Sequence, residues 1–486
     1  MTAGESNESD AGQLMEYDFD LICIGLGPAG MAASLTAAGT GLKVCAIDNN
    51  KLGGECMNCG SIPSKALLKI AKLRHDCTKL SKMHLEQFPS PQVKNLFEKL
   101  QADINFIRDK KSLRMFGNVE MLLEQGPAAF VDKHTIQVEG KKISAAKIFI
   151  AAGSRPEILP IPGLKECSPL TNQNIFTLSA IPESMAVIGG GAVACELAQA
   201  FSRLGCKITM FMRSQHLLSK CDYEAAILLE EQLRKEGITL LAGTSLKNVE
   251  AKDGGYVLTT DSGWNVEVNK ILASTGRSMD FSTLKLENAG IKYSPFGITT
   301  DKYLRTSVPW IYAIGDCNGQ HQYSHSAMHQ GMIALLNAMR PYPFKKDFRK
   351  YAVPYTIFTE PQISAVGMSA HELNDQQVPY ETYVAHYDDY GAAIAQETKT
   401  GFVKVFASSN GAIYGAVIAG EGSGEMINEW TLAIQHNLRM QDILMTQHSF
   451  PTMGVLSRRT AEAWMMNRMQ SNTRRKLARF LFKNCY

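Results

Sequence analysis

The 486-residue sequence lacks several features that define whole classes of protein. It has no apolar run near the ~20 residues of a transmembrane helix, and residues 1–17 lack the basic and apolar regions of a secretion signal. Fifty Lys and Arg against 47 Asp and Glu leave a net charge of +3, which calls for neither nucleic acid nor a membrane as partner. We therefore expect a cytoplasmic protein of two to four domains.

The sequence also lacks the pattern of a disulfide framework. Its 11 cysteines are odd in number, and most lie inside apolar runs, as do Cys23, Cys45, Cys195 and Cys206. Such cysteines are typical of small core residues in a reducing cytosol. The polar residues 1–17 are expected to be a disordered lead-in.

A dinucleotide-binding pattern stands near the start of the chain. Residues 19–24 predict a buried parallel strand and residues 31–38 a helix, and between them lies a G-x-G-x-x-G turn formed by Gly25, Gly27 and Gly30. The glycines allow a tight turn, and the helix N-terminus receives a pyrophosphate. A second apolar strand over residues 43–47 ends at Asp48, which is placed to bond a ribose hydroxyl.

Residues 53–65 read G-G-E-C-M-N-C-G-S-I-P-S-K and open a helical pattern. They closely resemble the redox-active segment of the class I flavoprotein disulfide reductases, in which two cysteines stand five positions apart. Here the first is Cys56, whereas the second position holds Ser61 and an additional Cys59 precedes it. The resemblance implies FAD as cofactor, bound also by the start of this segment at Gly54 and by Lys65.

Further landmarks of that family follow, and the resemblance assigns them to FAD. Ala128 stands in the segment that meets the adenine, and Gly153 closes the first pass of the FAD domain. Residues 306–316 end in Asp316, which matches the aspartate that binds the ribityl–phosphate region. Ser324 precedes a histidine whose neighbours approach the flavin.

A second dinucleotide unit has a strand at residues 185–188, the turn residues Gly189, Gly191 and Ala194, and a helix. At the spacing that Asp48 has after Gly25, Met212 follows Gly189, and Arg213 comes next. Because an Arg accommodates a 2′-phosphate that an acidic residue would repel, we expect NADPH, with NADH as the alternative. His216 and Lys220 extend this basic cluster.

The resemblance places two more site residues in this half. Glu196 matches the glutamate that pairs with the lysine of P-S-K, here Lys65, beside the flavin. Gly276 and Arg277 stand in the segment that ends the nicotinamide domain.

From Tyr351 the pattern changes to alternating strands that resemble the family's dimerisation domain, which implies a homodimer. In relatives that domain ends with H-x-H-P-T-x-x-E, whose second His and Glu are the acid–base pair. Here Phe450 stands at the base position and Val455 at the glutamate position. His448 matches the first, non-catalytic His and is interpreted as structural.

The predicted fold class is α/β, with two Rossmann-like dinucleotide-binding domains and a C-terminal α+β dimerisation domain. The FAD domain is expected at 18–157 and 280–350, the NAD(P) domain at 158–279, the dimerisation domain at 351–467 and a basic tail at 468–486. The tail carries several cations, no acidic residue and an apolar edge. Packing on its own subunit is the favoured interpretation, and peripheral contact with a membrane surface is the alternative.

The substitutions fall together on the disulfide side. A serine hydroxyl does not ionise near neutral pH, and the ring of Phe450 relays no proton. We predict an FAD-dependent oxidoreductase that passes hydride from NADPH to FAD and on to a small molecule or small protein. Two alternatives stay open: a disulfide reductase with an unusual Cys56–Cys59 pair, since residues three apart on a helix are neighbours and C-x-x-C favours thiolates, or a non-catalytic FAD-bound sensor or scaffold.

Overall fold

The computed structural model describes residues 16–87 and 89–484, and these form two compact units. Unit 1 comprises the described residues up to Gly54, with Ser112–Gly153 and Met279–Lys346. Unit 2 comprises Glu55–Lys111, Ser154–Ser278 and the described residues from Asp347 onward. Of the expected lead-in at 1–17, all but the last two residues lie outside the described part.

Unit 1 is built on a sheet in the order β3-β2-β1-β6-β5-β4, with β18 also paired to β6. The bounds of its strands are β1 (Phe19–Ile24), β2 (Val44–Asp48), β3 (Val119–Leu123), β4 (Ala129–Phe130), β5 (Thr135–Val138), β6 (Lys141–Ile150) and β18 (Ile311–Ala313), with a separate hairpin of β16 (Tyr293–Ser294) and β17 (Gly297–Ile298). Its helices are α1 (Pro28–Gly39) and α7 (Ser324–Met339), with short turns at η3 (Leu113–Phe116), η5 (Ser282–Leu284), η6 (Leu286–Ala289) and η7 (Gly315–Asn318).

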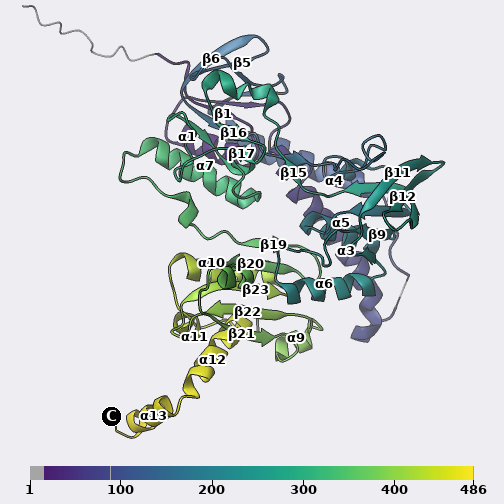
Figure 1. Cartoon of the computed structure of the whole chain (residues 1–486), viewed down its shortest axis with the longest axis vertical. Coiled ribbons are helices and arrows are strands. Elements are labelled where there is room, and N and C mark those ends of the chain that lie inside the picture. Colours follow the sequence, from purple (N-terminus) through teal and green to yellow (C-terminus); the bar gives the residue numbers. More distant parts are fainter. Residues whose placement is uncertain (1–15, 88, 485–486) are drawn as a thin grey trace, which may run out of the picture. The chain divides into compact units, whose positions relative to one another are not determined.

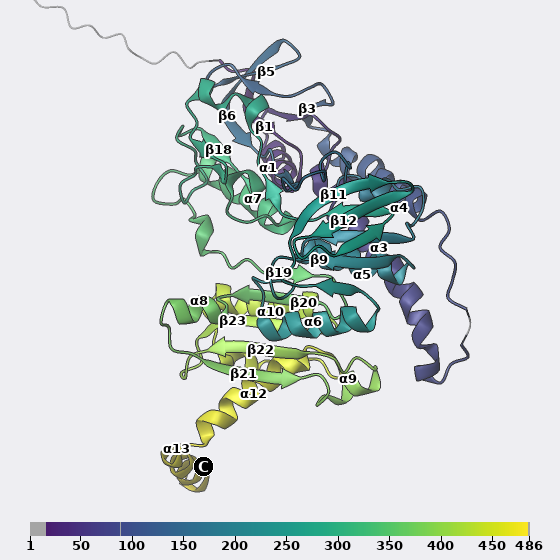
Figure 2. The same cartoon turned by 45° about the vertical axis from the view of Figure 1, so that its right-hand side comes forward.

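The central strands of this sheet are short apolar runs, as parallel strands covered on both faces must be. β1 pairs in parallel with β2 and with β6, and β18 continues the parallel part on the far edge of β6. The chain therefore returns to the same sheet after a long excursion. Helices α1 and α7 lie side by side (Figure 2). The predicted strands at 19–24 and 43–47 and the helix after the first glycine turn are confirmed.

The first part of unit 2 contains a four-stranded parallel sheet in the order β10-β9-β8-β14. The bounds of its strands are β8 (Ser184–Ile188), β9 (Lys207–Phe211), β10 (Thr239–Leu241) and β14 (Lys270–Ala273), with a three-stranded sheet of β11 (Leu246–Lys252), β12 (Gly255–Thr260) and β13 (Asn265–Val268), and a pair β7 (Arg155–Pro156) and β15 (Arg277–Ser278). The helices are α2 (Gly54–Asn58), α3 (Ser61–Asp76), α4 (Leu96–Asn105), α5 (Ala192–Arg203) and α6 (Tyr223–Lys235), with η1 (Cys77–Met83), η2 (Phe106–Ser112) and η4 (Ile175–Thr177).

The later part of unit 2 is an antiparallel sheet in the order β19-β20-β23-β22-β21 (Figure 1). The bounds are β19 (Tyr355–Ile357), β20 (Ile363–Gly367), β21 (Glu381–His386), β22 (Phe402–Ala407) and β23 (Ile413–Ala419), with helices α8 (Ala370–Asp375), α9 (Gly391–Ala395), α10 (Ser423–Gln435), α11 (Met440–Met445), α12 (Val455–Met469) and α13 (Asn472–Asn484), and the turn η8 (Phe348–Lys350). A single hydrophobic cluster includes Leu67 of α3, Phe201 of α5 and Ile363 of β20, so these elements share a core.

No helix in residues 16–87 and 89–484 is long and apolar enough to cross a membrane. The ten cysteines in that part of the chain are free thiols. The same residues hold no group of three His, Cys, Asp or Glu side chains arranged to bind a metal ion.

Candidate functional site

The glycine turn of unit 1 is fixed by close approaches that leave no room for side chains. Gly25 has φ +100°, and a Cβ there would lie 2.2 Å from the carbonyl oxygen of Ala151. A Cβ at Gly30 would lie 1.8 Å from the carbonyl oxygen of Gly25. Gly27 is the N-cap of α1 in extended conformation, and the Cα of Gly54 packs against it. The turn therefore presents bare backbone at the start of α1.

Asp48 ends β2 beside this turn. The N–H of Leu26 donates to its Oδ2 at 2.6 Å, and the N–H of Asn50 donates to its Oδ1 at 2.8 Å. Burial raises the pKa of the Asp48 carboxyl, and these two donors oppose part of that rise. Each carboxylate oxygen keeps acceptor capacity for a ribose hydroxyl.

The remaining residues that the sequence assigned to FAD also belong to unit 1. Asp316 lies in η7, and its neighbour Gly315 packs so closely that a Cβ would be 3.2 Å from the Cβ of Ala29 in α1. Ser324 is the first residue of α7. Ala128 is buried just before β4, and Gly153 follows β6 with φ +71°.

These observations fit the chemistry of FAD. The first N–H groups of α1 have no intrahelical partner and lie at the positive end of the helix dipole, which suits a pyrophosphate. The glycines keep Cβ atoms away from that position, and the Asp48 carboxylate stands where a ribose would follow.

The glycine turn of unit 2 repeats this geometry, except that its third position is an alanine instead of a glycine. Gly189 has φ +129°, and a Cβ there would lie 2.2 Å from the carbonyl oxygen of Ser274. Gly191 caps α5 in extended conformation, and nothing stands within 4 Å of where its Cβ would be. The third position is Ala194, which is fully buried. A helix N-terminus is thus again open to an anion.

The end of the second strand differs from unit 1. Met212, just after β9, is 3% exposed, and its Cβ would lie 3.3 Å from a Cβ at Gly190. Arg213 and Lys220 are exposed, whereas the Nδ1 of His216 turns to Glu230 at 3.4 Å. Of the basic cluster, Arg213 and Lys220 therefore keep their charges at the surface, and the histidine faces a carboxylate.

The redox segment is two helices rather than one. Helix α2 ends at Asn58, Gly60 adopts φ −125° and ψ −118°, and α3 starts at Ser61. A Cβ at Gly60 would lie 2.8 Å from the carbonyl oxygen of Glu55, so the break requires glycine. The N–H of Cys59 still bonds the carbonyl of Glu55 at 2.9 Å. Cys56 and Cys59 therefore share one helical turn, and Ser61 belongs to the next helix.

The environment of Cys59 opposes ionisation. Burial, reinforced by the charge of Glu55, raises the pKa of its thiol to about 12. The expectation that the C-x-x-C spacing favours a thiolate is not met at Cys59, because burial disfavours the anion and the residue follows the C-terminal end of α2 rather than a helix start.

Lys65 and Glu196 form the pair that the sequence predicted. The Nζ of Lys65 lies 2.8 Å from Oε2 of Glu196, whose side chain is 7% exposed. A third residue completes the arrangement: the N–H of Phe358 donates to Oε1 of Glu196 at 2.9 Å, and its ring lies 4.3 Å from the Lys65 ammonium. Both carboxylate oxygens are occupied, so the ammonium is held in one place.

Arg277 of β15 reaches the redox segment. Its Nη2 donates to Oε2 of Glu55 at 2.5 Å, and its Nε donates to Oγ of Ser154 at 2.6 Å. Gln173 donates to the other oxygen of Glu55 at 2.7 Å. Glu55 was not singled out from the sequence, and it lies 222 residues from its partner. This ion pair joins α2 to the end of the nicotinamide part.

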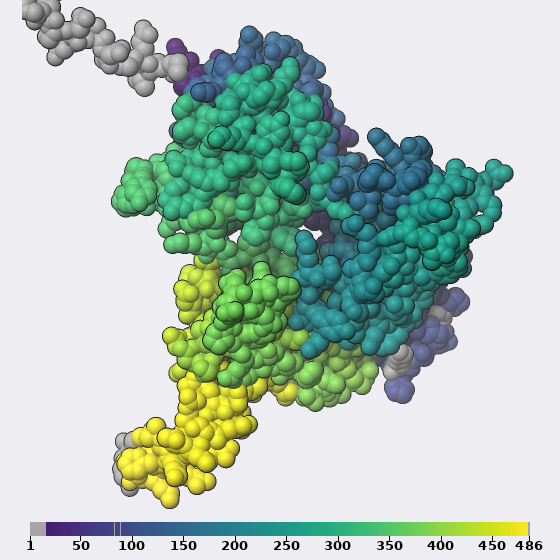
Figure 3. All heavy atoms as spheres, viewed as in Figure 1, coloured from purple at the N-terminus to yellow at the C-terminus, as the bar shows by residue number. Residues whose placement is uncertain are grey.

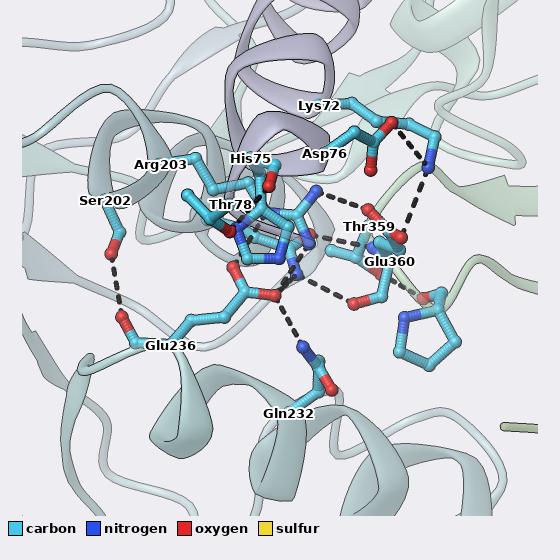
Figure 4. Close-up of polar contacts among 12 residues, drawn as sticks. Lys72, His75, Asp76, Thr78, Ser202, Arg203, Gln232, Glu236, Thr359 and Glu360 are labelled. Atoms are coloured by element: carbon cyan, nitrogen blue, oxygen red, sulfur yellow. Dashed lines mark hydrogen bonds and ion pairs between the residues drawn. The ribbon is translucent and has the colours of Figure 1, made fainter. Parts of the chain in front are cut away.

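A charged cluster fixes the far end of α3 (Figure 4). The Arg203 guanidinium lies between two carboxylates, with Nε 2.7 Å from Oε2 of Glu236 and Nη1 2.5 Å from Oε2 of Glu360. Lys72 and Lys79 each approach Oε1 of Glu360 at 3.2 Å. Burial alone would raise the pKa of Glu360, but the three cations outweigh it and lower the pKa to about 2.

Residues 358–360 therefore contact helices α3 and α5 at two places, near the Lys65–Glu196 pair and at the charged cluster. Phe358 bonds Glu196, and the backbone of Glu360 exchanges two hydrogen bonds of 2.8 Å with the side chain of Gln199. Glu196, Gln199 and Arg203 stand on one face of α5. Segment 358–360 was read from the sequence only as the start of the dimerisation domain. Arg203 and Glu236 carried no motif, and although Glu360 lies in the recognised segment, nothing in the sequence marked it as their partner.

The segment that corresponds to the family's acid–base pair has different contacts. Phe450 is 79% exposed in the single chain, and Val455 is the first residue of α12. The Nε2 of His448 lies 2.8 Å from Oε1 of Glu429 in α10, and its Nδ1 lies 3.1 Å from the carbonyl oxygen of Thr446. The Nε2 of His448 therefore anchors this loop to α10, and its Nδ1 bonds within the loop.

Comparison with known families identifies two matching regions. The sequence profile described as pyridine nucleotide-disulphide oxidoreductase matches residues 19–331. The profile of that family's dimerisation domain matches residues 353–458.

Individual relatives and solved structures agree with these matches. The chain is 32% identical to a dihydrolipoyl dehydrogenase of Chlamydia muridarum, over 93% of this chain and 96% of the relative. It is 31% identical to a mercuric reductase of Staphylococcus aureus, over 88% of this chain and 79% of the relative. The crystal structure of LpdA from Mycobacterium tuberculosis is similar in fold, with a TM-score of 0.83 and 26% identity over 91% of this chain and 99% of that one.

Proposed function

Since the chain belongs to the pyridine nucleotide-disulphide oxidoreductase family, whose members are FAD-dependent oxidoreductases, we propose that it passes hydride from NADPH to FAD and on to an acceptor other than its own dithiol. The observation that carries the proposal is the Lys65–Glu196 pair. All of its charged atoms are held by partners within unit 2, although the positions of the disulfide cycle have changed.

FAD, when bound, supplies a centre that takes up a hydride and gives its electrons onward. The chain's own residues supply position and charge. Glu196 is fixed by the N–H of Phe358 and in turn fixes the ammonium of Lys65, which the Phe358 ring covers on one side. A charge that is already in place costs no reorganisation when charge develops next to it.

The preference for NADPH rests on the end of β9. Asp48 has no acidic counterpart in unit 2, where Met212 is buried and Arg213 is exposed. A guanidinium bonds a 2′-phosphate with charge-assisted hydrogen bonds, and no carboxylate stands at this position to accept from a 2′-hydroxyl.

The absence of a dithiol step rests on three positions. Ser61 offers a hydroxyl where a thiol is needed, Phe450 offers a ring where a base is needed, and Val455 offers no carboxylate. A thiol that leaves a disulfide requires a proton donor, and a side chain without an N–H or O–H cannot supply one.

A second candidate, disulfide reduction by Cys56 and Cys59, is favoured by one observation. The bond from the Cys59 N–H to the Glu55 carbonyl keeps the two cysteines within one helical turn, where side chains three apart are neighbours. Burial opposes this function, because it raises the pKa of the Cys59 thiol to about 12 and so disfavours the attacking thiolate.

The dimerisation domain supports a homodimer in solution. The 79% exposure of Phe450 in the single chain fits a residue that a second copy covers. Sedimentation of the FAD-loaded protein should give a dimer at all practical concentrations. A monomer independent of concentration would contradict this assignment.

The test of the proposed function is anaerobic mixing of the FAD-loaded protein with NADPH or NADH, with the yellow flavin absorbance as readout. We expect rapid bleaching, faster with NADPH, followed by recovery of the colour on addition of a competent acceptor from a panel of nucleotides, quinones, metal ions and disulfides. Absence of bleaching with either nucleotide would instead favour a non-catalytic FAD-bound scaffold.

A further inference from the structure

The last described helix, α13, buries none of its residues. It follows α12 and projects away from the antiparallel sheet of unit 2, as the yellow ribbon shows in two views (Figures 1 and 2). In the space-filling view it stands out beyond the rest of that sheet's surface (Figure 3). The expectation that this segment packs on its own subunit is therefore not met among the described residues.

The two faces of α13 have opposite character. Arg475, Arg479 and Lys483 recur every four residues and so form one cationic line, and Lys476 lies beside it. Leu477 and Leu481 lie opposite this line and Phe480 lies at its border, with exposed fractions of 54%, 44% and 62%. The separation of the faces is incomplete, because Arg474 stands beside Leu481 and Phe482, 91% exposed, stands beside Arg475. The sequence has no acidic residue after Glu462.

Such a helix gains little stability by itself. Thirteen residues are marginal for an isolated helix in water, and like charges four apart repel each other. Met465, Met466 and Met469 of the preceding helix α12 are also exposed, so both consecutive helices carry exposed apolar side chains. The counter-surface that stabilises α13 must therefore be both negatively charged and able to take up apolar side chains.

We propose that α13 binds the surface of a lipid bilayer that contains anionic lipids, and that it lies in the interface with its apolar face inserted. A basic face opposite Phe and Leu is what such helices require. Nucleic acid would satisfy the cations but leave Leu477, Phe480 and Leu481 in water. A second copy of α13 would cover the apolar face, but it would place two cationic helices together over a seam of a few side chains, well below a stable interface area.

The experiment uses the full-length, FAD-loaded protein and sedimentation with vesicles. One set consists of phosphatidylcholine alone, and the other contains equal parts of phosphatidylcholine and phosphatidylglycerol. We expect binding to the anionic vesicles only, with an affinity that falls as salt rises. Each cation near an anionic surface is worth roughly fivefold, so the double variant Arg475→Gln/Arg479→Gln should bind ~25-fold more weakly.

A second double variant tests the apolar face. Leu477→Gln/Phe480→Gln keeps every charge and should also lose at least tenfold in vesicle affinity, because each apolar side chain that stays in water forfeits its transfer free energy. Lys141→Gln/Lys142→Gln is the matched control, since both lysines are exposed on the strand β6. That control should bind anionic vesicles like the unaltered protein. Flavin reduction by NADPH should be unchanged in all three variants, which shows that they are folded.

Four results would overturn the proposal. Equal binding to neutral and anionic vesicles would show that charge does not drive the binding. No binding to either set would show that α13 does not bind a membrane. A loss of dimer on sedimentation of Leu477→Gln/Phe480→Gln would assign α13 to a second copy. Binding to duplex DNA that depends on Arg475 and is indifferent to Leu477 would assign it to nucleic acid.

Discussion

Two regions of unit 2 differ in how closely they match the family to which the chain belongs: one keeps the family's residues and the other does not. At the Lys65–Glu196 pair, each carboxylate oxygen has a partner, and Phe358 closes the arrangement. At residues 448–455, Phe450 and Val455 stand at the positions of the family's acid–base residues, and the remaining His448 contacts Glu429. Under the proposed function, this difference means that the residues for nicotinamide oxidation are kept, whereas those for disulfide exchange are not.

The two glycine turns show a similar division of labour on a shared geometry. Both begin with a glycine at positive φ whose Cβ would lie 2.2 Å from a carbonyl oxygen. In unit 1 the next strand ends in a carboxylate, Asp48, and in unit 2 it ends in Met212 and Arg213. We propose that the backbone sets where a pyrophosphate binds and that one side chain per unit sets which nucleotide is preferred.

The largest effect is expected at the cluster that anchors α3 and α5. Replacing Arg203, whose side chain is 5% exposed, with Met leaves Glu236 without its cation and removes one cation from Glu360. Loss of one partner from a buried ion pair costs about 3–5 kcal/mol, measured by urea unfolding. The control is Lys252→Met, whose exposed pair with Glu267 has the same 2.6 Å length and should cost less than ~1 kcal/mol. Equal losses in both variants would refute the role of burial.

The same cluster predicts a specific acid dependence. The pKa of Glu360 is about 2 in the folded protein against an ordinary 4.5, so the carboxylate contributes stability above the ordinary pKa that is lost as pH falls through the lowered one. The contribution is about 3 kcal/mol at neutral pH. In Glu360→Gln this part of the loss between about pH 4.5 and 2 should disappear. A variant with an unchanged acid profile would show that Glu360 does not carry it.

Lys65 is expected to matter for rate rather than for stability. Lys65→Met removes a charge that Glu196 holds in a fixed, partly buried position, and loss of such a group typically costs on the order of 100-fold in rate. Stopped-flow reduction of FAD by NADPH measures it. Lys72→Met, on the same helix, is the control and should leave the rate nearly unchanged. If FAD in the Lys65 variant were reduced at the original rate, the Lys65–Glu196 pair would have no role in hydride transfer.

Arg213 tests whether the residue after the second strand of unit 2 sets the preference for NADPH. Charge-assisted contacts are worth about 1.5–3 kcal/mol, so Arg213→Ala should lose roughly tenfold to hundredfold in efficiency with NADPH and little with NADH. Lys220→Ala should have a smaller effect, since it stands further from the strand end. Equal efficiency with both nucleotides in the unaltered protein would overturn the assignment.

Local sequence patterns predicted the elements that hold the nucleotides, because short apolar runs, glycines and strand-end residues act within a few positions of one another. The strands 19–24, 43–47 and 185–188 are confirmed, as is the resemblance to the flavoprotein disulfide reductases. The break at Gly60 was not anticipated, since it depends on how closely its backbone approaches Glu55.

Contacts between distant residues escaped prediction for a different reason. Glu55 meets Arg277 across 222 residues, and Arg203 meets Glu360 across 157. Nothing in the local sequence of Glu55 or Glu360 marks it as the partner of a distant arginine. Buried and exposed glutamates are often flanked by the same kinds of residues along the chain. Phe358 likewise reads as one more apolar residue before a strand, although its N–H orients Glu196.

The most direct test of the central claim is to count electrons and thiols. The FAD-loaded protein is titrated anaerobically with NADPH, and free thiols are measured before and after. We predict two electrons per FAD, no new thiols, and nearly unchanged flavin reduction in Cys56→Ser and Cys59→Ser. Four electrons per FAD, with two new thiols per subunit that vanish in Cys59→Ser, would contradict the account and assign disulfide chemistry to Cys56 and Cys59.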